Sequence, residues 1–322
     1  MKKYFLKRIL TMVPVFVGLS IIIFVLINIA PGDPYMNIVE GQISISASDT
    51  ETALNAIGYY DPVHLKYVKW MGKILKGDMG TSIRYNEPVV DIIKRRISNT
   101  FLLSIVTLIL TTLIALHLGI ASATKPYSFK DKVLTILALI GISIPGFFIA
   151  LVIIKIFAIN LGWFPISGLS TVGEKLKGFD KFIDVIKHMI LPVISMTILE
   201  VASLMRYTRS AMLDVFNQNY IRTARAKGLN EKIIIYKHAF RNALIPIVTL
   251  LSMSLGYIVA GTILIETIFV WPGMGTLFYQ AIANRDYPLV MGCAMILSSC
   301  ILLADLISDI VYCLVDPRIR FK

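Results

Sequence analysis

The sequence is poor in charge and in cysteine. Only 16% of its 322 residues are charged, against about a quarter in soluble domains. Hydrophobic residues make up 56%, and the mean hydropathy is +0.74. A soluble chain of this composition would expose large apolar patches, which monomers rarely do. The three cysteines, Cys293, Cys300 and Cys313, share the last apolar run, so no disulfide framework or metal site is indicated. The composition predicts a membrane protein.

Motifs for catalysis are also missing. No G-x-x-x-x-G-K-[ST] occurs, so the chain has no phosphate-cradling loop and is not expected to hydrolyse ATP itself. Neither H-E-x-x-H nor G-x-S-x-G is present, and the four histidines fall in four different segments. We therefore expect neither an enzyme nor a cofactor or metal ion bound by this chain.

Six apolar runs are long enough to cross a bilayer, which requires about 20 apolar residues as helix. They are residues 9–30, 97–124, 133–154, 186–205, 243–265 and 287–311. The first run exceeds the apolar stretch of a signal peptide and no cleavage site follows it, which indicates a retained span. Pro145-Gly146 interrupts the third run and should loosen that helix, because proline removes a backbone hydrogen bond. The predicted fold class is an all-α polytopic membrane protein with six transmembrane helices.

The distribution of basic residues predicts the orientation. Loop 206–242 carries eight Lys/Arg, and loop 124–132 and the C-terminal tail are also basic, whereas loop 266–287 has one Arg and two acids. Short cytoplasmic loops collect Lys and Arg, so both termini are expected in the cytoplasm. The net charge of +12 would suggest nucleic acid for a soluble protein. Here the topology accounts for it, and no nucleic-acid partner is expected.

This orientation divides the chain into parts. Residues 1–30 are the first transmembrane helix, 31–96 an external N-terminal cap segment rich in turn residues, 97–315 a five-helix core containing the cytoplasmic loop 206–242, and 316–322 a cytoplasmic tail. Residues 158–187 are also expected outside, where Trp163 and Phe164 suit an interfacial anchor.

Ionisable residues inside a membrane are functional candidates by default. Glu266, like Lys155, lies near the end of a span, where we expect its side chain to reach toward the interface. Glu200 lies deeper and is expected to face the interior of the bundle, either in a helix–helix hydrogen bond or on a transport path. Ser143, Pro145, Glu200 and Glu266 are the candidates for a pathway or gate.

The basic stretch 219–246 has the pattern of a bent helix pair. A helix is predicted over 219–226, with Gly228 as the left-handed residue that ends it. Asn230 follows as an N-cap with Glu231 in the first turn, opening a helix to about residue 244. Anionic lipid could attract the charges, and a DNA-binding pair is disfavoured because both ends are tethered to spans. Docking to a cytoplasmic partner would explain the bend, so lipid and docking both stay open at this point.

The segment "RTARAKGLNEKIIIYKHAFRNALIP" resembles the cytoplasmic EAA loop of binding-protein-dependent ABC importer permeases, and more closely the peptide/nickel family, first-subunit type. Arg222-Thr223-Ala224 takes the place of the first triplet, and Gly228 falls at the expected spacing. The sequence departs from the general pattern at His238–Arg241, where I-x-L-P would stand. Further segments fit in order: "APGDP", "GDMGTSIRYNEPVVDII", "LGWFPISG", "ETIFVWPGMGTLFYQAIANRDYPLVMG" and "DPRIR".

The resemblance implies a multi-pass subunit of the cytoplasmic membrane. Its partners would be a second homologous permease subunit, two ABC ATPase subunits that hold ATP and Mg²⁺, an external solute-binding protein and membrane lipid. The residues implied to couple ATP hydrolysis to transport are Arg222, Thr223, Ala224, Arg225, Lys227, Gly228, Leu229 and Asn230.

The implied cargo is a dipeptide or oligopeptide. The alternative within the family is nickel or a nickel chelate, which is less favoured because no His/Cys set suggests bare metal. An autonomous secondary transporter is the alternative from another class. Such carriers often have inverted repeats, and the sequence shows no convincing internal repeat.

Overall fold

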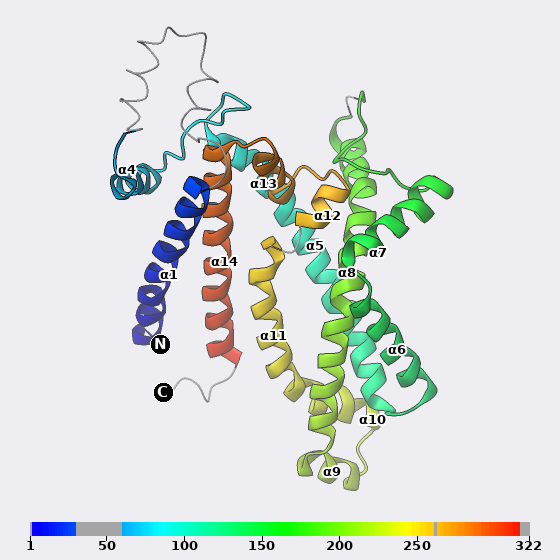
Figure 1. The fold of residues 1–322 in the computed structure, drawn as a ribbon. Coiled ribbons are helices and arrows are strands. Elements are labelled where there is room, and N and C mark those ends of the chain that lie inside the picture. The colour runs from blue at the N-terminus through cyan, green and yellow to red at the C-terminus, as the bar shows by residue number, and fades with distance from the viewer. Residues whose placement is uncertain (1, 30–59, 175, 261–262, 316–322) are drawn as a thin grey trace. The chain divides into compact units, whose positions relative to one another are not determined.

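Helices account for almost all regular structure in the part of the chain that is described (Figure 1). The structure is a computed structural model that describes residues 2–29, 60–174, 176–260 and 263–315. Five of its helices are long and apolar enough to cross a membrane, and one bent pair makes up to a sixth span. The predicted all-α membrane fold is confirmed, and the described residues hold five candidate spans, or six if the bent pair counts as one. The "APGDP" segment and the tail 316–322 lie outside the described residues.

One compact unit comprises residues 1–99 and 273–302. Its elements are α1 (Lys2–Ile29), α4 (Val63–Leu75), the start of α5 (Val89–Thr124), α13 (Met274–Ala283) and the first part of α14 (Tyr287–Val315). Tyr67 and Trp70 of α4 pack against Phe24 of α1, with ring centroids 5.5 and 5.6 Å from that ring. In the same contact the hydroxyl oxygens of Tyr67 and Ser20 are 2.7 Å apart.

The segment before α5 is joined to the start of α14 by the buried Asp286. Its carboxylate accepts hydrogen bonds from the Ser82 hydroxyl and, at 3.2 Å each, from the backbone N–H groups of Ile83 and Arg84. Helix α5 begins at Val89, well before the apolar run starting at residue 97, so the last part of the expected external segment 31–96 is helical. Hydropathy missed this start because the first turns of α5 are charged.

The second compact unit comprises residues 100–272 and 303–322. Its elements are the rest of α5, α6 (Phe129–Ser143), α7 (Gly146–Ile153), the π-helix η1 (Ile154–Asn160), α8 (Gly178–Phe216), α9 (Asn219–Ala226), α10 (Glu231–Ile233), the π-helix η2 (Ile234–Phe240), α11 (Arg241–Ala260), α12 (Ile263–Ile268) and the end of α14. Helix α8 is central, since α6, α7, α11 and α12 all pack against it.

The third predicted span is broken rather than merely loosened. Its two halves are bent by 103°. Ile144 is extended, with ψ 129°, and Pro145 caps α7. A residue before proline avoids the α region, and proline removes a donor, so the chain leaves the helix here. Pro192 and Pro246 lie inside α8 and α11 without such a break.

Two hydrophobic clusters form the core of this second unit. One contains Phe269 and Trp271 and draws on α5, α7, α8 and α12. The other gathers buried side chains from α5, α6, α8, α9, η2 and α11. Because the cluster just described contains residues of α9 and η2, it packs the bent helix pair predicted around Gly228 against the ends of the long helices.

Candidate docking element

The docking element is defined as residues 219–240, which comprise α9, α10 and η2 and lead into α11 (Figure 1). Helix α9 spans Asn219–Ala226, as the sequence predicted. Ile221 and Ala224 are buried in the same cluster as Met205 and Met212 of α8. The basic side chains of α9 are on its outer side, so the helix is held by its apolar face and exposes its charge.

Gly228 ends α9 in a Schellman arrangement. Its φ is +72°, and its N–H donates to the Arg225 carbonyl at 2.9 Å. The next N–H, of Leu229, donates to the Ala224 carbonyl at 3.4 Å. This pair of bonds satisfies carbonyls that the end of a helix leaves open. A Cβ at Gly228 would meet nothing within 4 Å, so backbone conformation, not space, requires glycine here.

Asn230 caps the helix that follows the bend. Its side-chain oxygen accepts from the Lys232 N–H at 2.9 Å, and Glu231 occupies the first turn, as predicted. Arg225 Nε lies 3.1 Å from Glu231 Oε1 across the bend, and the guanidinium lies 5.8 Å from the centre of the Phe216 ring. The ion pair is about half exposed and such pairs contribute about 0–1 kcal/mol. The backbone caps therefore set the shape of the element.

The structure separates the eight predicted coupling residues into two groups. Ala224 is buried and anchors α9. The other seven are exposed: Arg222, Thr223, Arg225, Lys227, Gly228, Leu229 and Asn230. Leu229 adds an apolar side chain, 38% exposed, to this basic surface. The exposed group is therefore a shaped, positively charged surface with an apolar contact, which suits a protein groove with acidic walls.

The predicted helix from 231 to about 244 is only partly an α-helix. After one turn, residues Ile234–Phe240 form a π-helix, with Ile234, Ile235 and Ala239 buried. Single π turns often occur at functional sites. Sequence periodicity does not distinguish such a wide turn from an α turn over so few residues, which is why it was missed.

Two of the predicted pathway residues lie at the bend between α6 and α7. Ser143 is the last residue of α6, is exposed, and donates from its hydroxyl to the Leu139 carbonyl at 2.8 Å. Pro145 is exposed at the start of α7. The bend is thus bordered by a small polar residue and a proline.

The predictions for the two glutamates have different outcomes. Glu266 does not reach the interface: it is fully buried, and its carboxylate accepts from the Thr100 hydroxyl at 2.6 Å. Removing a carboxylate from water costs free energy, and the hydrogen bond from Thr100 offsets part of that cost. Glu200 makes one of the two interactions predicted for it, a helix–helix hydrogen bond: the Thr111 hydroxyl of α5 donates to its carboxylate at 3.4 Å. Within this chain the residue is otherwise exposed on α8.

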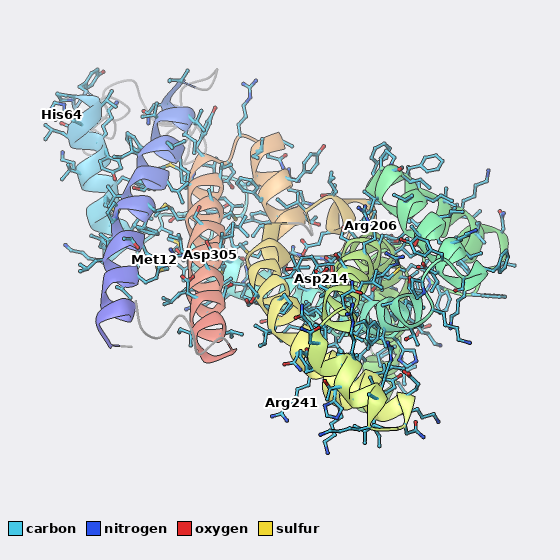
Figure 2. The ribbon with its side chains drawn as sticks, turned by 90° about the horizontal axis from the view of Figure 1, so that it is seen from below. Met12, His64, Arg206, Asp214, Arg241 and Asp305 are labelled. Carbon is cyan, nitrogen blue, oxygen red and sulfur yellow. The ribbon has the colours of Figure 1, made fainter. Side chains whose placement is uncertain are left out.

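Glu200 begins an exposed polar stripe on α8 that the sequence reading missed. Its other members follow at helical spacing: Ser203, Arg206, Tyr207, Ser210 and Asp214. Arg206 and Asp214 can be followed in Figure 2. Side chains three and four residues apart share one face of a helix. The predicted span ended at residue 205 because hydropathy falls there, but the helix continues to Phe216. A periodicity test across that boundary would have found the stripe.

Residues 115–321 match the family described as binding-protein-dependent transport system inner membrane component, and residues 1–106 match its N-terminal companion. The chain is 41% identical to the oligopeptide transport system permease protein AppB of Bacillus subtilis (strain 168), over 100% of both chains. It is 35% identical to the dipeptide transport system permease protein DppB of Escherichia coli (strain K12), again over 100% of both.

Among solved structures, the chain is similar to one from the MetNI methionine ABC transporter in inward-facing conformations. The TM-score is 0.50 at 17% identity, and the match covers 68% of this chain and 96% of that one. At this identity the likeness concerns the fold alone.

Proposed function

Because the chain belongs to the family of binding-protein-dependent transport system inner membrane components, we propose that it is the membrane-spanning permease subunit of an ATP-driven importer of dipeptides or oligopeptides. Membership makes it a multi-pass protein of the inner (cytoplasmic) membrane and the permease component of such a system, not its ATPase. The observation that carries the proposal is similarity over the full length to permeases named for peptide transport.

The proposed complex contains partner subunits that the family description does not specify. Two ATPase subunits would bind ATP and Mg²⁺, a second homologous permease subunit would complete the pathway, and an external solute-binding protein would deliver the peptide. Both termini would lie in the cytoplasm, which is the side that the basic loops favour. Peptide is proposed over nickel because the relatives named above are named for peptides.

The docking element is proposed to fit a groove of an ATPase subunit. Its seven exposed coupling residues supply charge and one apolar contact, while Ile221 and Ala224 join the element to the core. The exposed polar stripe on α8 is proposed to border the pathway, with Ser143 and Pro145 at the bend between α6 and α7. Glu266 is instead proposed to have a structural role, because its side chain is enclosed.

Reconstitution with the partner subunits and the binding protein tests this function. We expect ATP-dependent accumulation of labelled dipeptide or oligopeptide in proteoliposomes, with none when ATP is replaced by a non-hydrolysable analogue. Uptake of ⁶³Ni²⁺ or its chelate in place of peptide would contradict the proposal that the substrate is a peptide. Uptake by this chain alone, driven by an ion gradient, would overturn the ATP-driven mechanism.

A further inference from the structure

We propose that Asp131 and Arg209 are positioning residues that transmit movement of the docking element to α6 and its bend. This inference rests on the proposed function, because it concerns how ATP hydrolysis reaches the pathway. It identifies a connection inside the chain that is separate from the surface proposed to touch the ATPase.

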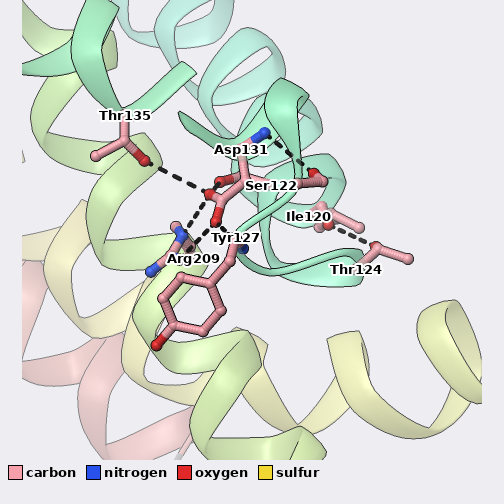
Figure 3. A network of polar contacts seen from close by, with 8 residues as sticks. Ile120, Ser122, Thr124, Tyr127, Asp131, Thr135 and Arg209 are labelled. Carbon is pink, nitrogen blue, oxygen red and sulfur yellow. Dashed lines mark hydrogen bonds and ion pairs between the residues drawn. The ribbon is translucent and has the colours of Figure 1, made fainter. Parts of the chain in front are cut away.

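The two side chains form a bidentate ion pair between α6 and α8 (Figure 3). Arg209 Nε lies 2.7 Å from one carboxylate oxygen of Asp131, and the Arg209 terminal nitrogen Nη2 lies 2.8 Å from the other. The Asp131 side chain is 4% exposed and that of Arg209 24%. Two parallel charge-assisted bonds fix direction as well as distance, which a single contact to lysine would not.

The same carboxylate also contacts two further parts of the chain and a threonine on its own helix (Figure 3). The Ser122 hydroxyl at the end of α5 donates to it, as does the backbone N–H of Tyr127 at 2.8 Å. Thr135, one turn along α6, donates from its hydroxyl at 3.5 Å. Tyr127 has a φ of +63°, so a strained turn is held by this contact. One side chain therefore connects α5, the turn after it, α6 and α8.

On the α8 side, the ion pair lies close to the docking element. Arg209 precedes α9 by the last turns of α8, and the buried Ile221 and Ala224 of α9 share a cluster with Ala211 and Met212. Beside the pair, α5 and α8 approach so closely that a Cβ on Gly119 would lie 2.6 Å from the Thr208 Cβ. Packed interiors transmit displacement rather than absorb it. A shift of α9 should therefore move this end of α8, and Arg209 with it.

On the α6 side, the pair sits at the opposite end of the helix from the bend. Asp131 lies in the first turn of α6, and Ser143 is its last residue. In between, Gly141 packs tightly on Ala202 of α8, where an added Cβ would be 3.3 Å away. Helix α6 thus spans from the ion pair to the 103° break at Ile144 and Pro145. Moving its first turn would change the bend, which borders the proposed pathway.

The experiment compares variants in the reconstituted complex with peptide. Asp131→Asn removes the charge and keeps the shape of the side chain. Arg209→Lys keeps the charge but cannot make the two parallel hydrogen bonds of the guanidinium. Glu87→Gln is the matched control, since it breaks the exposed ion pair with Arg95 outside the proposed coupling route. For each variant we would measure copurification of the ATPase subunits, ATP hydrolysis, and peptide taken up per ATP hydrolysed.

We expect Asp131→Asn to bind the ATPase subunits and hydrolyse ATP while peptide uptake per ATP falls about tenfold, within the usual range of coupling between sites. Arg209→Lys should give a smaller fall, and Glu87→Gln none. Unchanged uptake per ATP in Asp131→Asn would overturn the inference. If Asp131→Asn fails to assemble, Arg209→Lys decides in the same way. If the wild-type complex takes up no peptide, the proposed function fails, independently of the variants.

Discussion

Gly228 is the residue on which the bend of the docking element depends. Its φ of +72° lies in the left-handed region, and its N–H completes the bond to the Arg225 carbonyl. Any L-residue with a side chain pays about 1–2 kcal/mol for that conformation. Proline would also lose the donor, and its ring restricts φ to about −65°. The position therefore allows a graded test of whether shape, rather than charge, makes the element work.

We predict that Gly228→Pro inserts into the membrane but uncouples ATP hydrolysis from uptake, lowering peptide uptake per ATP by about tenfold or more. Gly228→Ala should lower it less, because alanine keeps the N–H donor and is disfavoured by only about 1–2 kcal/mol in this backbone conformation. The measurement is peptide accumulated per phosphate released. Gly173→Ala is the control: Gly173 also has positive φ, +91°, and open space, but lies in the loop before α8. Normal coupling in Gly228→Pro would contradict a docking role for the bend.

Helix α8 combines two surfaces along its length. One side packs against α6, α7, α11 and α12, and another exposes the polar stripe from Glu200 to Asp214. By contrast, the exposed side chains of α6 include Ile136, Leu137 and Ile140, as lipid contact requires. Charged and hydroxyl groups in a span usually face water or a protein partner rather than lipid. Because of this contrast between neighbouring helices, we expect the stripe to border the proposed pathway and the apolar side of α6 to face lipid.

We predict that cysteines introduced at Ser203 and Ser210 react with a water-soluble thiol reagent in the assembled complex. A cysteine at Leu137 of α6, which is 58% exposed and apolar, should stay unreactive because lipid covers it. Each cysteine is introduced into a variant in which Cys293, Cys300 and Cys313 have been replaced. Labelling is measured as an increase in the mass of the protein. Equal and slow reaction at all three positions would show that the stripe does not border water.

At the scale of the whole molecule, the alternation of basic loops predicts which ends of the helices face the cytoplasm. The docking element and the loop before α8 lie at opposite ends of α8, which runs from Gly178 to Phe216. They should therefore be on opposite sides of the membrane. The proposed function requires the docking element on the ATP side, so orientation and mechanism must agree.

We predict that a single cysteine at Lys227 is labelled by an impermeant maleimide only in inside-out vesicles. A cysteine at Val172, which is 98% exposed in the loop before α8, should be labelled in intact cells. Each variant serves as the control for the other, because membrane leakage would label both. Reaction of the Lys227 variant in intact cells would place the docking element outside and contradict its coupling role.

Much of the local structure could be predicted from the residues alone. Helix α9, the left-handed Gly228 and the Asn230 cap were all expected where they are found. Each depends on interactions within a few neighbouring residues, so a short stretch of sequence holds the necessary information. The apolar helices follow in the same way, since a bilayer selects long apolar runs as helices.

The residues that were misplaced are those whose environment comes from distant parts of the chain. Glu266 is enclosed because Thr100 of α5 lies beside it, and the polar stripe was missed because α8 continues beyond its apolar run. The pairing of Asp131 with Arg209 likewise joins two helices far apart in sequence. Hydropathy and capping therefore determined where the apolar spans lie and where the docking element bends, but not the ends of α5 and α8, the break between α6 and α7 or the π-helix η2. Which charges are buried, paired or exposed was decided only by the packing of helices against one another, because burial depends on neighbours that local sequence does not specify.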